Sequence, residues 1–210
     1  TTFGSGSDVT RISVLKVDGK KQSFHDDNFF ADVSIVDSDF LSNTPGQIKK
    51  NSAIDACAQC SEAFDSKSGN VYTKFLCKKA FDFLEDGILN KNNEKLVIGS
   101  LIAGLGFGNC STTLGHALSY VFSNEGFPHG HALAYTTTLA HKFNKSIFYN
   151  RFLQLVKELK FAPISLEADL DEAADLILTD SKHLENNPKP VTKKDIISLL
   201  EQINQETLFN

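Results

Sequence analysis

The hydrophobic and polar positions of the first forty residues follow a different pattern from those of the rest of the chain. Residues 10–24 alternate as a β-strand does, and Asp18–Gly19 interrupts them with a dipeptide typical of a tight hairpin turn. Residues 31–38 alternate again and predict a third strand. From Pro45 onward, apolar residues recur at intervals of three and four, which is the spacing of one helix face.

Helices are therefore predicted throughout the second part of the chain. We expect them over residues 45–65, 71–89, 94–108, 112–123, 130–143, 146–160, 166–179 and 192–206. The last begins with Thr192, followed three residues later by Asp195, which resembles a capping box. The pattern predicts a mainly α protein, with a short β region over residues 1–40 and an α-helical domain over residues 41–210.

Composition narrows the class of protein. The chain has 210 residues, of which 41% are hydrophobic and 22% charged, as is usual for a globular protein with a sizeable core. Its net charge of −5 argues against a nucleic-acid partner. The most apolar stretch, residues 95–110, is too short to cross a bilayer, so no membrane partner is expected. We see no signal peptide and expect a cytoplasmic location.

Two motifs have both a chemical and a structural interpretation, and the structural one is favoured for each. Cys57 and Cys60 form a CxxC, but it lies inside a predicted helix and has no second cysteine or histidine pair at zinc-site spacing. The glycine-rich stretch 104–109 lacks the preceding strand that a dinucleotide-binding loop requires. Close helix packing explains these glycines better.

The histidines are a stronger functional signal. Three of the six, at positions 116, 129 and 131, fall within sixteen positions of the chain. Asp55 and Gln59 stand four residues apart on one predicted helix, so both project from the same face. Singly, each of these residues also fits a helix cap, a core position or a solvated polar stripe, which would include Glu62. Together, Asp55, Gln59, His116 and His129 offer four ligands to one divalent metal.

The opening segment, TTFGSGSDVT, is rich in hydroxyl groups and glycines. Such a segment suits a phosphate or a ribose, which its hydroxyls and backbone N–H groups would contact. It equally fits a polar loop ahead of a strand.

Taken in order, these motifs resemble the iron-containing (group III) alcohol dehydrogenase family, over nearly the whole chain. The resemblance runs through TTFGSGSDVT, Lys21 of KKQSF, VSIVDSDF, IDACAQC, AGLGFGN, GHALSY, FPHGHALA and LENNPKPVTKKDI. In that family a Rossmann-like N-terminal domain binds NAD(P), and an all-helical C-terminal domain binds a divalent metal in the cleft between them. The chain begins where the family's TT-x-G-T-G-S-E-V-T motif begins. The resemblance therefore implies a fragment that lacks most of the nucleotide domain and is inactive alone.

The resemblance also implies roles for individual residues. It places the nicotinamide nucleotide against Thr1, Thr2, Ser5, Thr10 and Lys21. It places Fe²⁺ or Zn²⁺ on Asp55, Gln59, His116 and His129. Gln59 departs from the family's histidine, and its neutral amide oxygen is a weaker ligand than an imidazole. His131 is a candidate proton relay, with a polar residue at a helix N-terminus as the alternative.

The implied activity is reversible hydride transfer between NAD(P)(H) and a small alcohol or aldehyde, with the metal as a Lewis acid. A homodimer is possible, because the family commonly dimerises. Two other functions stay open: a metal-dependent sugar-phosphate lyase or dehydrogenase of the same architecture, and a non-catalytic, degenerate helical module. The scarcity of arginine, with only Arg11 and Arg151, counts against a phosphorylated substrate.

Overall fold

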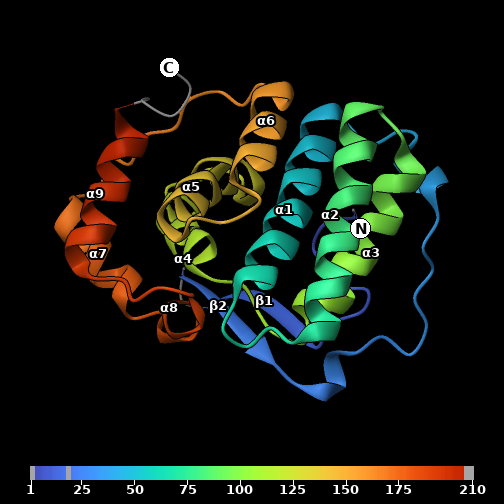
Figure 1. The fold of residues 1–210 in the computed structure, drawn as a ribbon, viewed down its shortest axis with the longest axis horizontal. Helices are drawn as coiled ribbons and strands as arrows, with labels where there is room; N and C mark the ends of the chain where they lie inside the picture. Colours follow the sequence, from blue (N-terminus) through green and yellow to red (C-terminus); the bar gives the residue numbers. More distant parts are fainter. Residues whose placement is uncertain (1–2, 18–19, 206–210) are drawn as a thin grey trace.

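The computed structural model describes residues 3–17 and 20–205 and shows a β-hairpin followed by an assembly of helices (Figure 1). β1 (Ile12–Val17) pairs antiparallel with β2 (Lys20–His25), so that Ile12 lies opposite His25. The alternation of residues 10–24 thus predicted this hairpin correctly. Two short 3-10 helices follow, η1 (Asp27–Phe29) and η2 (Ser38–Leu41).

The third strand predicted over residues 31–38 is wrong. This segment is irregular up to η2, and Val33 and Ile35 remain 80% and 78% exposed. A strand needs a neighbour that completes its backbone hydrogen bonds. In the part of the chain that the structure describes, β1 and β2 pair with each other and no strand lies beside residues 31–38. Alternation along the chain carries no information about such a neighbour.

All eight predicted helices are present, with ends that differ by a few residues. They are α1 (Gly46–Asp65), α2 (Val71–Leu89), α3 (Asn93–Phe107), α4 (Leu114–Asn124), α5 (His129–Asn144), α6 (Tyr149–Leu159), α7 (Leu170–Leu178) and α9 (Lys193–Asn204). A further helix, α8 (Ser181–Asn186), was not predicted, because six residues are too few for an apolar period to show. The capping box of Thr192 and Asp195 is confirmed at the start of α9. The mainly α fold class is confirmed.

Helix α1 is central to the fold. It packs against α2, α3, α4, α5 and α6, and in Figure 1 it lies between α2 and α3 on one side and α4 to α6 on the other. Most of its second half is buried, and many of these residues are alanine or cysteine, which lets neighbouring helices approach closely. Cys57 and Cys60 are two of them, as free thiols with no exposed surface. The structural interpretation of the CxxC is therefore confirmed.

The glycine-rich stretch 104–109 lies at the end of α3 and also serves packing. A Cβ atom on Gly104 would stand 2.6 Å from Val9 Cγ2, and one on Gly106 would stand 2.6 Å from Cys77 Sγ. Helix packing is thus confirmed as the reason for these two glycines.

At the other end of the molecule, α7, α8 and α9 lie beyond α4 and α5 (Figure 1). β2 contacts α4, so the hairpin and α8 both reach the part of the fold where α1, α4 and α5 meet. Across the described residues, no helix combines the length and apolar character needed to cross a membrane. The domain boundary at residue 40 stays a prediction.

Candidate metal and substrate site

Asp55, His116 and His129 come together where three helices meet. Asp55 lies in α1, His116 in the first turn of α4, and His129 at the first position of α5. One ligand atom from each residue lies within 4.8 Å of the other two. Carboxylate and imidazole ligands stand about 2 Å from a zinc-like ion, which places them within about 4 Å of one another. The three side chains are therefore spaced to share one cation after small adjustments.

Gln59 lies one turn after Asp55, and its side chain is oriented so that its oxygen could bind the same cation. Its Nε2 donates to Asp55 Oδ1 at 2.9 Å. A carboxylate only accepts hydrogen bonds, so the NH₂ end of the amide must face Asp55. The other end, Oε1, is buried and has no hydrogen-bond partner among the described residues. Because a buried carbonyl oxygen without a partner is costly, a cation beside Gln59 would be stabilising.

Glu62 supports His116 from behind. Its carboxylate is 1% exposed, and Oε2 lies 2.5 Å from His116 Nδ1. The backbone N–H groups of Gly115 and His116 also donate to it, so it satisfies the first turn of α4. Held in this way, the ring turns Nε2 toward Asp55 Oδ1, at 3.8 Å. A carboxylate behind an imidazole is the usual support of a metal-ligating histidine.

The charges of Glu62 and His116 depend on each other. Burial alone raises the pKa of Glu62 and lowers that of His116. The facing charges outweigh burial, so the pKa of Glu62 is lowered and that of His116 is raised to about 9. Glu62 is not a member of a solvated polar stripe. Its spacing of seven residues from Asp55 and its alanine-rich surroundings were the sequence signals of a buried supporting role.

His129 is oriented by α4. Its Nδ1 lies 3.3 Å from Ser119 Oγ, whose own proton is donated to the His116 carbonyl oxygen at 2.7 Å. The hydroxyl can then only accept from His129, which places the ring proton on Nδ1. The ring stacks on Tyr120, with centroids 6.2 Å apart and planes 9° apart. His129 is thus held in the tautomer whose Nε2 can ligate a metal.

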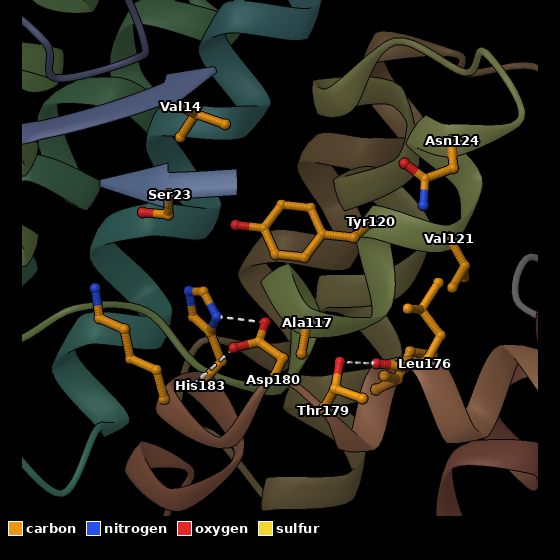
Figure 2. A pocket seen from close by; sticks show the side chains of 12 residues that line it. Val14, Ser23, Ala117, Tyr120, Val121, Asn124, Leu176, Thr179, Asp180 and His183 are labelled. Carbon is orange, nitrogen blue, oxygen red and sulfur yellow. Dashed lines mark hydrogen bonds and ion pairs between the residues drawn. The ribbon is translucent and has the colours of Figure 1, made fainter. Parts of the chain in front are cut away.

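The four predicted metal ligands line a cavity of about 290 Å³, which also receives residues from the hairpin and from α8. These include Ser23, His25, Lys182 and His183. A larger cavity of about 550 Å³ adjoins it and shares Tyr120 and His183 with it. Figure 2 shows Ser23 of β2, Tyr120 of α4 and His183 of α8 around the larger space.

His183 is a site residue that the sequence did not reveal. It is buried, its Nδ1 lies 2.6 Å from Asp180 Oδ2, and its ring stacks on His116 with centroids 6.2 Å apart. No local pattern connects residues so far apart in the chain, and α8 itself was not predicted. Nothing in the sequence distinguished His183 from the other isolated histidines, His25 and His141.

The predicted nucleotide-contacting residues are distributed differently. Ser5 is exposed and lines the same cavity as the metal candidates. Thr10 is buried and is not among the residues that line this cavity. Its Oγ1 has no hydrogen-bond partner among the described residues. Lys21 lies in β2, but its side chain is outside the described structure, as are Thr1 and Thr2.

His131 lies apart from the metal candidates. Its Nε2 donates to the Ala162 carbonyl oxygen at 2.6 Å, and its ring packs on Phe161, with centroids 5.2 Å apart. It lines neither of the two cavities. The predicted role as proton relay has no geometric support, whereas the alternative of a polar residue in the first turn of α5 fits its position.

The chain thus folds into a helical domain in which Asp55, Gln59, His116 and His129 line one small cavity. A family model described as "Fe-containing alcohol dehydrogenase family, C-terminal" matches residues 50–175. The chain belongs to this family, and the resemblance seen in its motifs is confirmed.

Curated relatives agree with this assignment. The 4-hydroxybutyrate dehydrogenase of Clostridium kluyveri is 28% identical, over 97% of this chain and 66% of the relative. The 1-propanol dehydrogenase PduQ of Salmonella typhimurium is 28% identical, over 78% of this chain and 48% of the relative. The chain thus spans less than two thirds of the length of these relatives.

Solved structures show the same fold. The iron-containing alcohol dehydrogenase of Thermotoga maritima superposes with a TM-score of 0.87 at 21% identity, over 98% of this chain and 62% of that one. The sulfoacetaldehyde reductase of Bifidobacterium kashiwanohense, solved in complex with NAD+, superposes with a TM-score of 0.85 at 24% identity. The match covers 96% of this chain and 62% of that one. At these identities the likeness establishes the fold alone.

Proposed function

We propose that this chain is the metal-binding part of an NAD(P)-dependent enzyme that interconverts small alcohols and aldehydes. The observation that carries the proposal is the convergence of Asp55, His116 and His129 within 4.8 Å. It lies within the region that the family model matches. Relatives named as alcohol dehydrogenases and reductases favour hydride transfer over a sugar-phosphate lyase or a degenerate helical module.

The residues present fit a divalent metal such as Fe²⁺ or Zn²⁺. Asp55 and Gln59 would supply oxygen ligands, and His116 and His129 would supply nitrogen ligands. When bound, the metal would supply Lewis-acid polarisation of a carbonyl oxygen. Glu62 accepts from the N–H of His116 Nδ1, so Nε2 is the ring nitrogen directed into the site. Ser119 does the same for His129. The proton that the raised pKa of His116 keeps on its Nε2 would be replaced by a bound cation.

The cavity beside these residues provides the place for a substrate. At about 290 Å³ it is small, so it suits a short-chain molecule. The ring of His183 stacks on His116 and that of Tyr120 stacks on His129, so both bring apolar ring surface to this cavity. Contacts of Thr1, Thr2, Ser5, Thr10 and Lys21 with the nicotinamide nucleotide remain part of the proposal. The position of Ser5 in this cavity supports them.

Location and assembly belong to the same proposal. All four cysteines are free thiols, which supports a reducing, cytoplasmic compartment. Homodimer formation is proposed on the family resemblance alone.

Metal content tests this proposal first. After anaerobic loading with Fe²⁺ or Zn²⁺, elemental mass spectrometry should find about one metal per chain, as in a mononuclear site. The double variant His116→Ala/His129→Ala should retain almost none. His131→Gln is the matched control, because it changes a neighbouring histidine outside the cavity, and it should keep the metal. Equal metal content in the double variant and the wild type would overturn the proposed site.

The reaction is tested separately. The chain alone is expected to be inactive, so this test uses a metal-loaded protein in which the chain is joined to an N-terminal nucleotide domain of the family. That protein should oxidise NADH or NADPH when a short-chain aldehyde is added, and a chelator should abolish this activity. Activity that persists in the metal-free double variant would contradict the proposal.

A further inference from the structure

We propose that Lys182 and His25 form an anion site in the candidate substrate cavity, which selects substrates with an acidic group remote from the reacting carbon. The inference deepens the proposed function and rests on it. It concerns two side chains for which no role was predicted from the motifs.

The first observation is that the Lys182 ammonium group faces the His25 imidazole without a carboxylate between them. Lys182 Nζ contacts both ring nitrogens of His25, and Nδ1 lies 3.4 Å away. Among the described residues, no carboxylate forms an ion pair with Lys182. The nearby carboxylate of Asp180 is engaged by His183 at 2.6 Å instead. The positive charge of Lys182 is therefore available to a ligand.

The second observation is the electrostatic setting of this pair. The pKa of His25 is lowered by partial burial and by the charges of Lys182 and Arg11. The pKa of Lys182 is lowered by partial burial and by Arg11, against the opposite effect of Asp180. Burial is the largest cause of both shifts, and at His25 the charges of Lys182 and Arg11 act in the same direction as burial. An anion bound beside Lys182 would compensate the partly buried charge of its ammonium group.

The third observation is location. Lys182 and His25 line the same 290 Å³ cavity as Asp55, Gln59, His116 and His129. His183, which follows Lys182 in α8, stacks on His116, so α8 is held directly against the metal candidates. One small molecule in this cavity can therefore reach both groups. Its oxygen at the reacting carbon would lie toward the metal ligands and its acidic group toward Lys182.

A carboxylate is the chemistry that fits this arrangement. It offers two acceptor oxygens, which match one ammonium donor and one imidazole donor. The substrate class is then a short hydroxy acid and the corresponding aldehyde acid. A phosphate of the nucleotide is the other possible source of such an anion, and the test separates the two.

The test compares 4-hydroxybutyrate with 1,4-butanediol, which keeps the chain length and the hydroxyl group but lacks the charge. Calorimetric titration of the zinc-loaded wild type should give an affinity about tenfold higher for the hydroxy acid. Lys182→Gln should remove this preference and leave diol affinity and metal content unchanged. Lys142→Gln, a control on α5 that lines neither cavity, should keep the preference.

Two further measurements keep the inference separate from the proposed function. Metal-free protein should still prefer butyrate over 1-butanol, because the anion site does not depend on the metal. A failure to bind metal would therefore contradict the proposed function, but the comparison of butyrate with 1-butanol would still test the anion site. Equal affinities for acid and diol in the wild type would overturn the anion site. Displacement of butyrate by ADP would assign the site to the nucleotide and equally overturn the proposed substrate class.

Discussion

Three polar side chains on α1 contribute to the candidate site in different ways. Asp55 offers a charged ligand, Gln59 an oriented neutral oxygen, and Glu62 a buried counter-charge that never faces the cation. These different roles follow from how deeply each side chain is buried. Glu62 is 1% exposed and is surrounded by the first turn of α4, whereas Asp55 and Gln59 line the cavity.

The supporting role of Glu62 leads to a prediction. Glu62→Gln keeps the shape of the side chain but removes the charge that holds His116. We expect metal affinity to fall about 10- to 100-fold, as when such a supporting partner is lost elsewhere. Competition with a chelator of known affinity measures this. Glu85→Gln is the control, since Glu85 pairs with Arg151 on α6, and its metal affinity should match the wild type. Unchanged affinity in Glu62→Gln would show that Glu62 is only structural.

Between elements, the site depends on how closely α4 approaches α1 and α5. Gly115 in α4 makes this approach possible, because a Cβ there would stand 2.3 Å from Glu62 Oε1 and 2.6 Å from Thr137 Oγ1. Glu62 is held by hydrogen bonds from the first turn of α4, and the backbone Cα of Thr137 would stand 2.8 Å from the added Cβ, so neither neighbour can move aside freely. The absence of a side chain at Gly115 therefore allows α4 to bring His116 close to Asp55.

Gly115→Ala tests this spacing. The added methyl should force α4 outward, lower the free energy of unfolding by about 1–3 kcal/mol and weaken metal binding. Urea denaturation and metal titration measure the two effects. Gly46→Ala is the matched control, because nothing lies within 4 Å of a Cβ at the start of α1. The control should be neutral or stabilising by up to about 1 kcal/mol, since alanine favours the helix. Equal behaviour of both variants would contradict the packing argument.

At the scale of the whole molecule, stability includes a buried histidine remote from the site. His141 is 1% exposed, its Nε2 lies 2.7 Å from Ser61 Oγ, and its Nδ1 lies 3.7 Å from Asp65 Oδ2. Serine, histidine and aspartate thus lie in line, yet none of them lines the two cavities described. Burial lowers the pKa of His141 to about 4, although Glu62 acts in the opposite direction. The group is therefore held neutral in the folded core.

This neutrality makes stability depend on pH. Below about pH 6.5 the unfolded chain binds a proton at His141, whereas the folded protein does not until about pH 4. The stabilisation that the protein gains by keeping His141 neutral is therefore complete above about pH 6.5, and it is lost as the pH falls from about 6.5 to about 4. Denaturant titrations should show the stability of the wild type relative to His141→Gln falling by about 2 kcal/mol from pH 7 to pH 5. Asp65, whose pKa burial raises to about 6, acts oppositely but is common to both proteins. A difference that does not change with pH would refute the buried neutral histidine.

Features that repeat over a few residues were predictable from the order of the amino acids alone. Apolar spacing fixed the hairpin and eight helices, and the four-residue spacing of Asp55 and Gln59 placed both on one helix face. Motifs along the chain were sufficient to indicate the family and the three convergent ligand candidates.

Which distant residues share the cavity depends on how the helices and the hairpin pack. This packing left residues 31–38 without a neighbouring strand, separated His131 from His129, and brought His183 and Lys182 to the metal candidates. It also converted Glu62 from an apparent surface position into a buried support. The physical reason is that periodicity reports which way a side chain points from its own helix. What it then meets depends on how α1, α4, α5, α8 and β2 pack, and no local pattern encodes those distances.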